Sequence, residues 1–172
     1  TDCVATLNSM AAAAVLAGET KQYAEQSHLN GATYYDYYQT LDGRYLSVGS
    51  LEPQFMSGLA TVLELPILLE KGTSFDATDQ KLVKQALQEK IKTKTFTEWS
   101  SIFAELDVCV EPVLHLDEAL TSPLAKQRQW VVDVPLAEES AQTEPQLACP
   151  IKFSRSKMSY QHIGKKLGED SF

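Results

Sequence analysis

The chain has 172 residues, of which 44% are hydrophobic and 22% are charged, and its formal net charge at pH 7 is -8. These proportions are typical of a soluble globular protein, and a chain of this length can bury a core without disulfides or metals. The acidic balance argues against nucleic acid and against an anionic membrane surface as partners, because both are bound through clustered positive charge.

Cysteine and histidine usage bears on redox state and on metals. Cys3, Cys109 and Cys149 are odd in number and form no CxxC pair, which predicts reduced thiols in a cytoplasmic protein. The histidines stand apart from the cysteines and from one another, so we predict no metal site. No apolar run approaches the roughly 20 residues of a membrane span. The start has neither a secretory-signal pattern nor an initiator Met.

A leading helix is predicted first. Apolar residues recur at helical spacing from Val4 to Val15 in an alanine-rich setting, and Gly18 follows as a helix stop. Such a helix is apolar around much of its circumference and needs cover on more than one side. The polar stretch 19–30 is predicted to be a connecting loop.

The next segment is rich in tyrosine, at positions 34, 35, 37 and 38, and tyrosine favours strands. Asp42-Gly43 follows, a dipeptide typical of the tight hairpin turn in which both central residues have positive φ. Alternating residues then lead to Gly49. We therefore predict a β-hairpin over residues 33–49.

Three helices are predicted after the hairpin. They start near Glu52, with Ser50 as the cap, near Asp76, and at Thr95, which opens a Thr-x-x-Glu capping box. A loop is predicted over residues 66–72. Each helix carries an apolar stripe. In chain order, the stripes are Phe55, Leu59, Val62 and Leu63 in the first helix, Leu82, Val83, Ala86, Leu87 and Ile91 in the second, and Trp99, Ile102, Phe103 and Leu106 in the third.

Short elements are predicted for the rest of the chain. A strand is expected at 108–114, where Pro112 indicates a sheet edge or a strand end. The further predictions are helical turns at 117–120 and 123–129, strands at 130–134 and 148–153, a polar loop at 138–145 and a poorly ordered basic tail from 154. Strands and helices mix without a β-α-β rhythm, which favours an α+β fold with an antiparallel sheet over a doubly wound parallel sheet.

Glu52 is the most interesting acid, since no GxSxG elbow and no phosphate-binding glycine loop is present. It is predicted directly after a strand, in the first turn of a helix, where functional side chains are common. The alternative is that its carboxylate only complements the helix dipole.

The tyrosines are the second candidates, because a tyrosine offers a ligand an apolar wall with one hydrogen-bonding tip. The alternative is cross-strand packing. In a strand, one face carries Tyr35 and Tyr37 and the other carries Tyr34, Asp36 and Tyr38, so at most one set lines a given pocket.

Three segments resemble a known family. Residues 31–55, GATYYDYYQTLDGRYLSVGSLEPQF, resemble the pattern GAPxYDxYxxxDGxxxxVGxxEPQF of the family III CoA-transferases, a group that includes the α-methylacyl-CoA racemases. Residues 107–113, DVCVEPV, resemble its DxCVxPV, and residues 153–155 its FSR. The leading helix resembles the segment after the family's large domain, so the resemblance covers nearly the whole chain in order.

The resemblance implies an architecture. Family members have a large Rossmann-like domain and a small α+β domain, and two subunits interlock so that each active site lies between the large domain of one and the small domain of the other. We therefore expect a leading helix from the large-domain junction with its connector at 1–30, the α+β small domain at 31–153 and a tail at 154–172. The expected partners are an acyl-CoA substrate, the missing large domain and a second subunit.

The resemblance also implies chemistry. In the racemases a His and an Asp of the large domain exchange the proton at the acyl α-carbon; in the transferases that Asp becomes an acyl carrier. Both lie upstream of this chain, which alone is expected to be inactive. No tightly bound cofactor is expected, since the coenzyme A thioester is the substrate. The Glu-Pro-Gln-Phe string at 52–55 favours the racemases over a CoA-transferase of the same fold; a non-catalytic interaction module is the third alternative.

Three residues acquire expected roles from the resemblance. Glu52 matches the glutamate that hydrogen-bonds the catalytic His and thereby supports catalysis. Tyr35 matches a tyrosine near the acyl moiety, and Leu51 matches an apolar wall position for the substrate.

Overall fold

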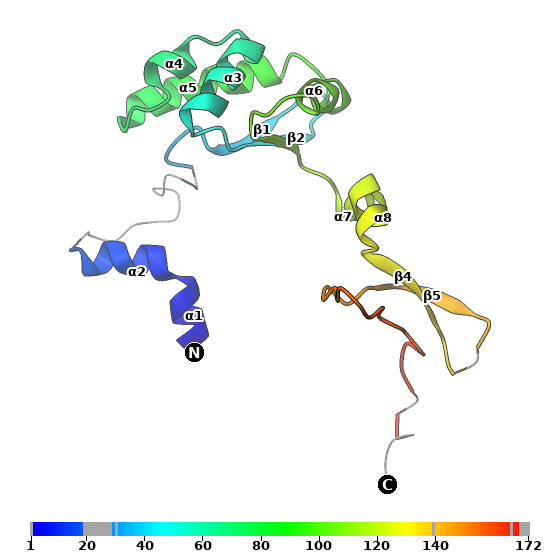
Figure 1. Ribbon diagram of the computed structural model, residues 1–172. Coiled ribbons are helices and arrows are strands. Elements are labelled where there is room, and N and C mark those ends of the chain that lie inside the picture. Colours follow the sequence, from blue (N-terminus) through cyan, green and yellow to red (C-terminus); the bar gives the residue numbers. More distant parts are fainter. Residues whose placement is uncertain (1, 19–28, 30, 139, 166, 169–172) are drawn as a thin grey trace. The chain divides into compact units, whose positions relative to one another are not determined.

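The computed structural model describes residues 2–18, 29, 31–138, 140–165 and 167–168 (Figure 1). The chain divides into two compact units, Thr1–Val113 and Leu114–Phe172, and each is described by itself. This division falls inside the predicted 31–153 domain, whose boundaries stay a prediction. Most of the predicted connector, residues 19–28 and 30, lies outside the described residues.

The leading segment forms two short helices, α1 (Asp2–Leu7) and α2 (Ser9–Leu16), so the prediction of one continuous helix is wrong. The break lies at Asn8, whose side-chain type competes with the helical backbone for hydrogen bonds. Gly18 has φ +89 and follows the end of α2, which confirms it as a stop. No residue of α2 is buried.

A three-stranded antiparallel sheet of order β1-β2-β3 organises the first unit. Its strands are β1 (Asp36–Gln39), β2 (Tyr45–Val48) and β3 (Val110–Pro112). The pairing of β1 with β2 confirms the predicted hairpin, and the edge position of β3 agrees with Pro112. The chain is therefore α+β, as predicted.

The turn of this hairpin differs from the tight turn that Asp42-Gly43 predicts. Thr40 N–H donates to the Arg44 carbonyl at 2.8 Å, and Gly43 N–H donates to the Thr40 carbonyl at 3.1 Å. Gly43 has φ +80 but Asp42 does not have a positive φ. This is the longer loop in which one glycine takes the left-handed conformation. The Asp42 carboxylate instead accepts a hydrogen bond from Phe96 N–H at 3.0 Å and so ties the loop to a later helix.

Helices α3 (Pro53–Leu63), α5 (Ala77–Ile91) and α6 (Phe96–Phe103) have Glu52, Asp76 and Thr95 as their N-caps, which confirms the three predicted starts. The Thr95–Glu98 capping box is formed. A short helix, α4 (Ile67–Lys71), replaces the loop predicted at 66–72, because the sequence ILLEK buries Leu68 against the core.

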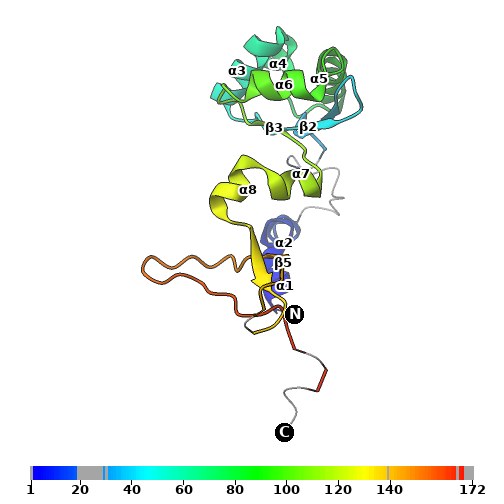
Figure 2. The same cartoon turned by 90° about the vertical axis from the view of Figure 1, so that its right-hand side faces the viewer.

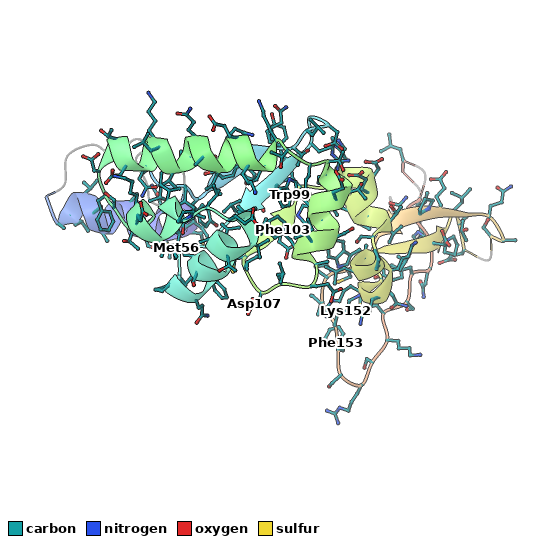
Figure 3. All side chains as sticks on the ribbon, turned by 90° about the horizontal axis from the view of Figure 1, so that it is seen from above. Met56, Trp99, Phe103, Asp107, Lys152 and Phe153 are labelled. Atoms are coloured by element: carbon teal, nitrogen blue, oxygen red, sulfur yellow. The ribbon has the colours of Figure 1, made fainter. Side chains whose placement is uncertain are left out.

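The core of this unit lies between the sheet and the helices, which cover one face of the strands in Figure 2. Trp99 and Phe103 stack with ring centroids 5.5 Å apart, and they lie close together in Figure 3. The helical stripes differ from the prediction at their margins: Leu82 and Leu106 are exposed, whereas Met56 and Ala60 are buried. The buried set is Tyr34, Tyr38, Leu46, Val48, Met56, Leu59, Ala60, Leu63, Leu68, Val83, Leu87, Ile91, Trp99, Phe103, Val108 and Val110.

Polar side chains of α5 cover the free edge of β1. Gln88 Nε2 donates to the Gln39 carbonyl at 2.8 Å, and Gln88 Oε1 accepts from Gln39 N–H at 3.1 Å. Two turns earlier, Gln80 Oε1 accepts from Tyr34 N–H at 2.9 Å. The edge of the hairpin thus has its backbone groups satisfied by a helix rather than by another strand.

The second unit contains α7 (Leu116–Thr121), α8 (Pro123–Arg128) and an antiparallel pair, β4 (Val131–Pro135) and β5 (Thr143–Leu147). The strand predicted at 148–153 is wrong, since the last strand, β5, ends at Leu147 and begins within the polar loop predicted at 138–145. All of its residues are exposed, so no apolar alternation marks it. The tail contacts the β4–β5 pair, where Ile163 N–H donates to the Pro135 carbonyl at 2.9 Å.

None of the helices within the described ranges has the length and apolarity that a membrane crossing requires.

Candidate functional site

The outer face of the three-stranded sheet carries the candidate site. Leu46 and Val48 of β2 are buried against the helices, so the alternate residue between them, Ser47, points to the other face. The strand register places Tyr37 opposite Ser47 on one side and Glu111 opposite Ser47 on the other. A phenol, a hydroxyl and a carboxylate therefore form a row across the sheet.

An open hollow of about 670 Å³ lies over this row, within the first unit. Its lining joins the hairpin, the residue before β3 and the start of α3, which are far apart in the sequence. The lining residues are Leu29, Tyr35, Asp36, Tyr37, Ser47, Val48, Gly49, Glu52, Cys109 and Glu111.

The tyrosines divide between the two faces as their alternation predicts. Tyr34 and Tyr38 are 0% and 3% exposed and belong to the core, whereas Tyr35 and Tyr37 are 36% and 65% exposed and line the hollow. Asp36 pairs its carboxylate with Lys84 Nζ at 2.8 Å. Its carboxylate is therefore held by α5 rather than presented as a free acid.

The Tyr35 ring packs directly against Gly49. A Cβ atom at position 49 would lie 3.3 Å from the Tyr35 ring and 3.5 Å from the Cys109 carbonyl oxygen. The distance to the carbonyl oxygen is an ordinary contact, but the distance to the ring is short, so a side chain at position 49 would displace the Tyr35 ring by a few tenths of an ångström.

Glu52 is the N-cap residue of α3, and its side chain is exposed at the rim of the hollow. Its backbone is extended, with φ -68 and ψ 141, and its carbonyl accepts from Met56 N–H at 2.9 Å. The carboxylate makes no capping hydrogen bond to the helix. Glu52 thus lines the hollow with a carboxylate that the helix beginning beside it does not engage.

The predicted cap, Ser50, has a different role. Its hydroxyl donates to the Val108 carbonyl, so the prediction that Ser50 caps α3 is wrong. Leu51 is half-buried and packs against the core, outside the lining of the hollow. The structure therefore brings Tyr35 and Glu52 to one hollow and leaves Leu51 out of its lining.

The charges of the hollow are negative. Burial and then the carboxylates of Glu52, Asp107 and Glu111 raise the pKa of the Cys109 thiol, which disfavours the thiolate. Among the described lining residues there is no histidine, lysine or arginine. A carboxylate rim without a cation suits a protonated imidazole or another positively charged partner group.

Ser47, Cys109 and Glu111 line the hollow but were not among the site residues predicted from the sequence. The sequence could have indicated Ser47, because it alternates with Leu46 and Val48 in β2 and so belongs to the opposite face of the strand. Nothing local indicates Glu111, because its place in the hollow depends on the pairing of β3 with β2, which are far apart in the sequence. No group of three or more His, Cys, Asp or Glu that could hold a metal ion occurs within the described ranges.

Comparison with known proteins gives one family. The sequence pattern of CoA-transferase family III matches residues 1–171. Alpha-methylacyl-CoA racemase of Mus musculus is 38% identical over 104 residues, which are 60% of this chain and 27% of the mouse protein. Alpha-methylacyl-CoA racemase of Homo sapiens is 31% identical over 146 residues, 83% of this chain and 38% of the human protein. The chain thus spans well under half the length of these curated relatives.

Solved structures show the same fold. A CAIB/BAIF family protein from Brucella suis has a TM-score of 0.67 at 18% identity, over 95% of this chain and 42% of that one. A mutant of Rv3272 from Mycobacterium tuberculosis has a TM-score of 0.69 at 15% identity, over 94% of this chain and 41% of that one.

Proposed function

The chain belongs to CoA-transferase family III, and we propose that within this family it forms the C-terminal part of a 2-methylacyl-CoA racemase. Relatives that are 31% and 38% identical carry the name alpha-methylacyl-CoA racemase, which supports this branch. The proposed substrate is an acyl-CoA thioester with a branch at C2, and no tightly bound cofactor is required.

The reaction needs two groups that this chain does not supply. The proton at C2 of a thioester is weakly acidic, so a positioned base must remove it and the resulting enolate must be stabilised. A second group returns a proton to the opposite face of C2, and the thioester bond stays intact. In our proposal these groups are a His and an Asp of the large domain, which faces the hollow in an interlocked homodimer.

The observation that carries the proposal is the placement of Glu52. Its carboxylate lies at the rim of the hollow, is exposed, and does not cap the helix that begins beside it. A carboxylate in this place can accept a hydrogen bond from an imidazole N–H, fix the orientation of the ring and stabilise its protonated form. Tyr35 then offers the edge of its ring as a wall for the acyl chain.

The test uses the full-length protein that contains this chain. It is incubated in D2O with each C2 epimer of a 2-methylacyl-CoA, and deuterium at C2, epimer ratio and intact thioester are followed by NMR. We expect incorporation of deuterium together with inversion. Transfer of CoA to an added carboxylic acid without exchange at C2 would instead assign the protein to the transferases.

A further inference from the structure

The loop that carries Glu52 is held at several points of its backbone. Gly49 N–H donates to the Cys109 carbonyl at 2.8 Å, and Leu51 N–H donates to the Gly49 carbonyl at 2.9 Å. Between them, Ser50 is 0% exposed and its hydroxyl donates to the carbonyl of Val108. The bonds of Gly49 and Ser50 tie the residues before Glu52 to the chain segment that enters β3, and the bond of Leu51 closes the loop on itself.

A second buried side chain holds the same loop from the other side. The Tyr34 hydroxyl donates to the carbonyl of Ser50, and the Tyr34 ring is completely buried. Ser50 is therefore both a donor, through its hydroxyl, and an acceptor, through its carbonyl. The chain Tyr34–Ser50–Val108 links the residue before the hairpin to the residues before α3 and β3, beneath the hollow.

We propose that Tyr34 and Ser50 are positioning residues that fix the Glu52 carboxylate at the rim of the hollow. The inference rests on the proposed function, in which the Glu52 carboxylate binds and orients the catalytic imidazole. Only Leu51 separates Glu52 from Ser50, and Pro53 at the first helical position restricts the backbone on the other side. With both flanks restrained, the remaining freedom of Glu52 is that of its side chain.

The protonation state of Tyr34 is consistent with this role. Burial, and then the negative charge of Glu52, raise the pKa of Tyr34 to about 12. The hydroxyl therefore remains a hydrogen-bond donor throughout the pH range in which the enzyme would work.

Tyr38 provides a matched control. It is also buried, and its hydroxyl donates to a backbone carbonyl, that of Tyr34, at 2.8 Å. Tyr34→Phe and Tyr38→Phe each remove one buried hydroxyl and one hydrogen bond from the same core. Only Tyr34→Phe removes a bond to the loop that carries Glu52.

The experiment is a double-mutant cycle on α-proton exchange in the full-length protein, with thermal unfolding of every variant. Tyr34→Phe is expected to lower kcat for exchange about three- to thirtyfold, on the scale of a small misplacement of an orienting group, with KM unchanged. Tyr38→Phe should lower the unfolding temperature comparably but leave kcat unchanged. Ser50→Ala should reproduce the effect of Tyr34→Phe on kcat.

The Glu52→Gln background decides whether Tyr34 acts through Glu52. In that background Tyr34→Phe should have no further effect on kcat, because the charge that it positions is already absent. Equal loss of kcat in both backgrounds, unchanged kcat for Tyr34→Phe, or equal loss for Tyr38→Phe would overturn the inference. Unchanged exchange in Glu52→Gln itself would instead overturn the proposed function, so the two failures are distinguishable.

Discussion

Two acidic residues at helix N-caps, Glu52 and Asp76, are used for different purposes. The Asp76 carboxylate accepts hydrogen bonds from Thr78 N–H at 2.7 Å and Asp79 N–H at 3.2 Å, and these bonds lower its pKa. Glu52 makes no such bond to α3. The comparison favours the hydrogen-bonding role of Glu52 toward a partner group over a role in helix capping.

Glu52→Gln therefore separates the two alternatives for this residue. In the full-length protein the rate of α-proton exchange should fall roughly ten- to a thousandfold, on the scale of lost orienting or electrostatic groups. The free energy of unfolding should change by only about 0.3–1 kcal/mol. Asp76→Ala is the control: it should cost about 1 kcal/mol of stability and leave exchange unchanged. A less stable Glu52→Gln variant with normal exchange would restore the helix-dipole alternative.

Gly49→Ala tests whether the packing of the Tyr35 ring against Gly49 matters for substrate binding. The new Cβ would lie 3.3 Å from the ring, which must shift. Since we propose that this ring lines the acyl site, KM for the acyl-CoA should rise roughly threefold or more. Gly43→Ala is the control in steady-state kinetics: at φ +80 it should cost about 1–2 kcal/mol of stability without changing KM. An unchanged KM in Gly49→Ala would argue against a substrate contact for Tyr35.

At the scale of elements, α5 holds the hairpin in place through side chains that face β1. Gln80 is 3% exposed; besides its bond to Tyr34 N–H, its Nε2 donates to the Gly72 carbonyl at 3.0 Å and to the Ser74 carbonyl at 2.7 Å. One side chain thus joins the start of the hairpin, the end of α4 and α5.

Gln80→Ala should therefore be one of the more destabilising polar substitutions in this unit. It leaves buried backbone groups without partners, and each such group costs about 1–3 kcal/mol. Gln85→Ala, on the exposed face of the same helix, should change stability by less than about 0.5 kcal/mol. Urea unfolding of both variants measures the difference, and equal effects would contradict the assigned role of Gln80.

The start of α5 makes stability depend on pH. Asp79 accepts hydrogen bonds from Lys71 and from Ser74, and these lower the pKa of Asp79 below 3.8, whereas Asp79 raises the pKa of Lys71 above 10.5. The lowered pKa means that the contribution of Asp79 is complete above pH 3.8 and is lost as the pH falls through the folded-state value. The raised pKa means that the contribution of Lys71 is complete below pH 10.5 and is lost at higher pH.

The difference in stability between the wild type and Asp79→Asn should accordingly be largest near neutral pH. It should shrink in urea unfolding at about pH 3, where the unfolded carboxylate is protonated. Asp133→Asn, which alters an exposed acid of the second unit, serves as the control for general acid effects. A difference that stays constant from neutral to acidic pH would refute the contribution of this ion pair.

At the scale of the whole molecule, the hollow offers a carboxylate and phenols, but its described lining contains no histidine. The 172-residue chain by itself should therefore not catalyse exchange at C2 of a 2-methylacyl-CoA above the buffer rate. Deuterium incorporation by the isolated chain measures this, with the full-length protein as the positive control. Exchange well above the buffer rate would show that the catalytic groups lie within these residues.

Most of the first unit follows from local patterns in the sequence. The alternation of the tyrosines separates Tyr34 and Tyr38 from Tyr35 and Tyr37, and the capping residues Asp76 and Thr95 mark helix starts. These signals are local, because a strand face and a helix cap depend on residues only a few positions apart. The site prediction of Glu52 depended in addition on the family resemblance.

The tertiary structure decided which distant segments meet, which the local sequence patterns could not indicate. Glu111 and Cys109 join the hollow because β3 pairs with β2, and Ser50 binds the Val108 carbonyl instead of capping α3. Strand β5 forms although all of its side chains are exposed. Hydrogen bonds between segments so distant along the chain leave no trace in local periodicity, since they depend on which backbone groups the folded core leaves in need of a partner.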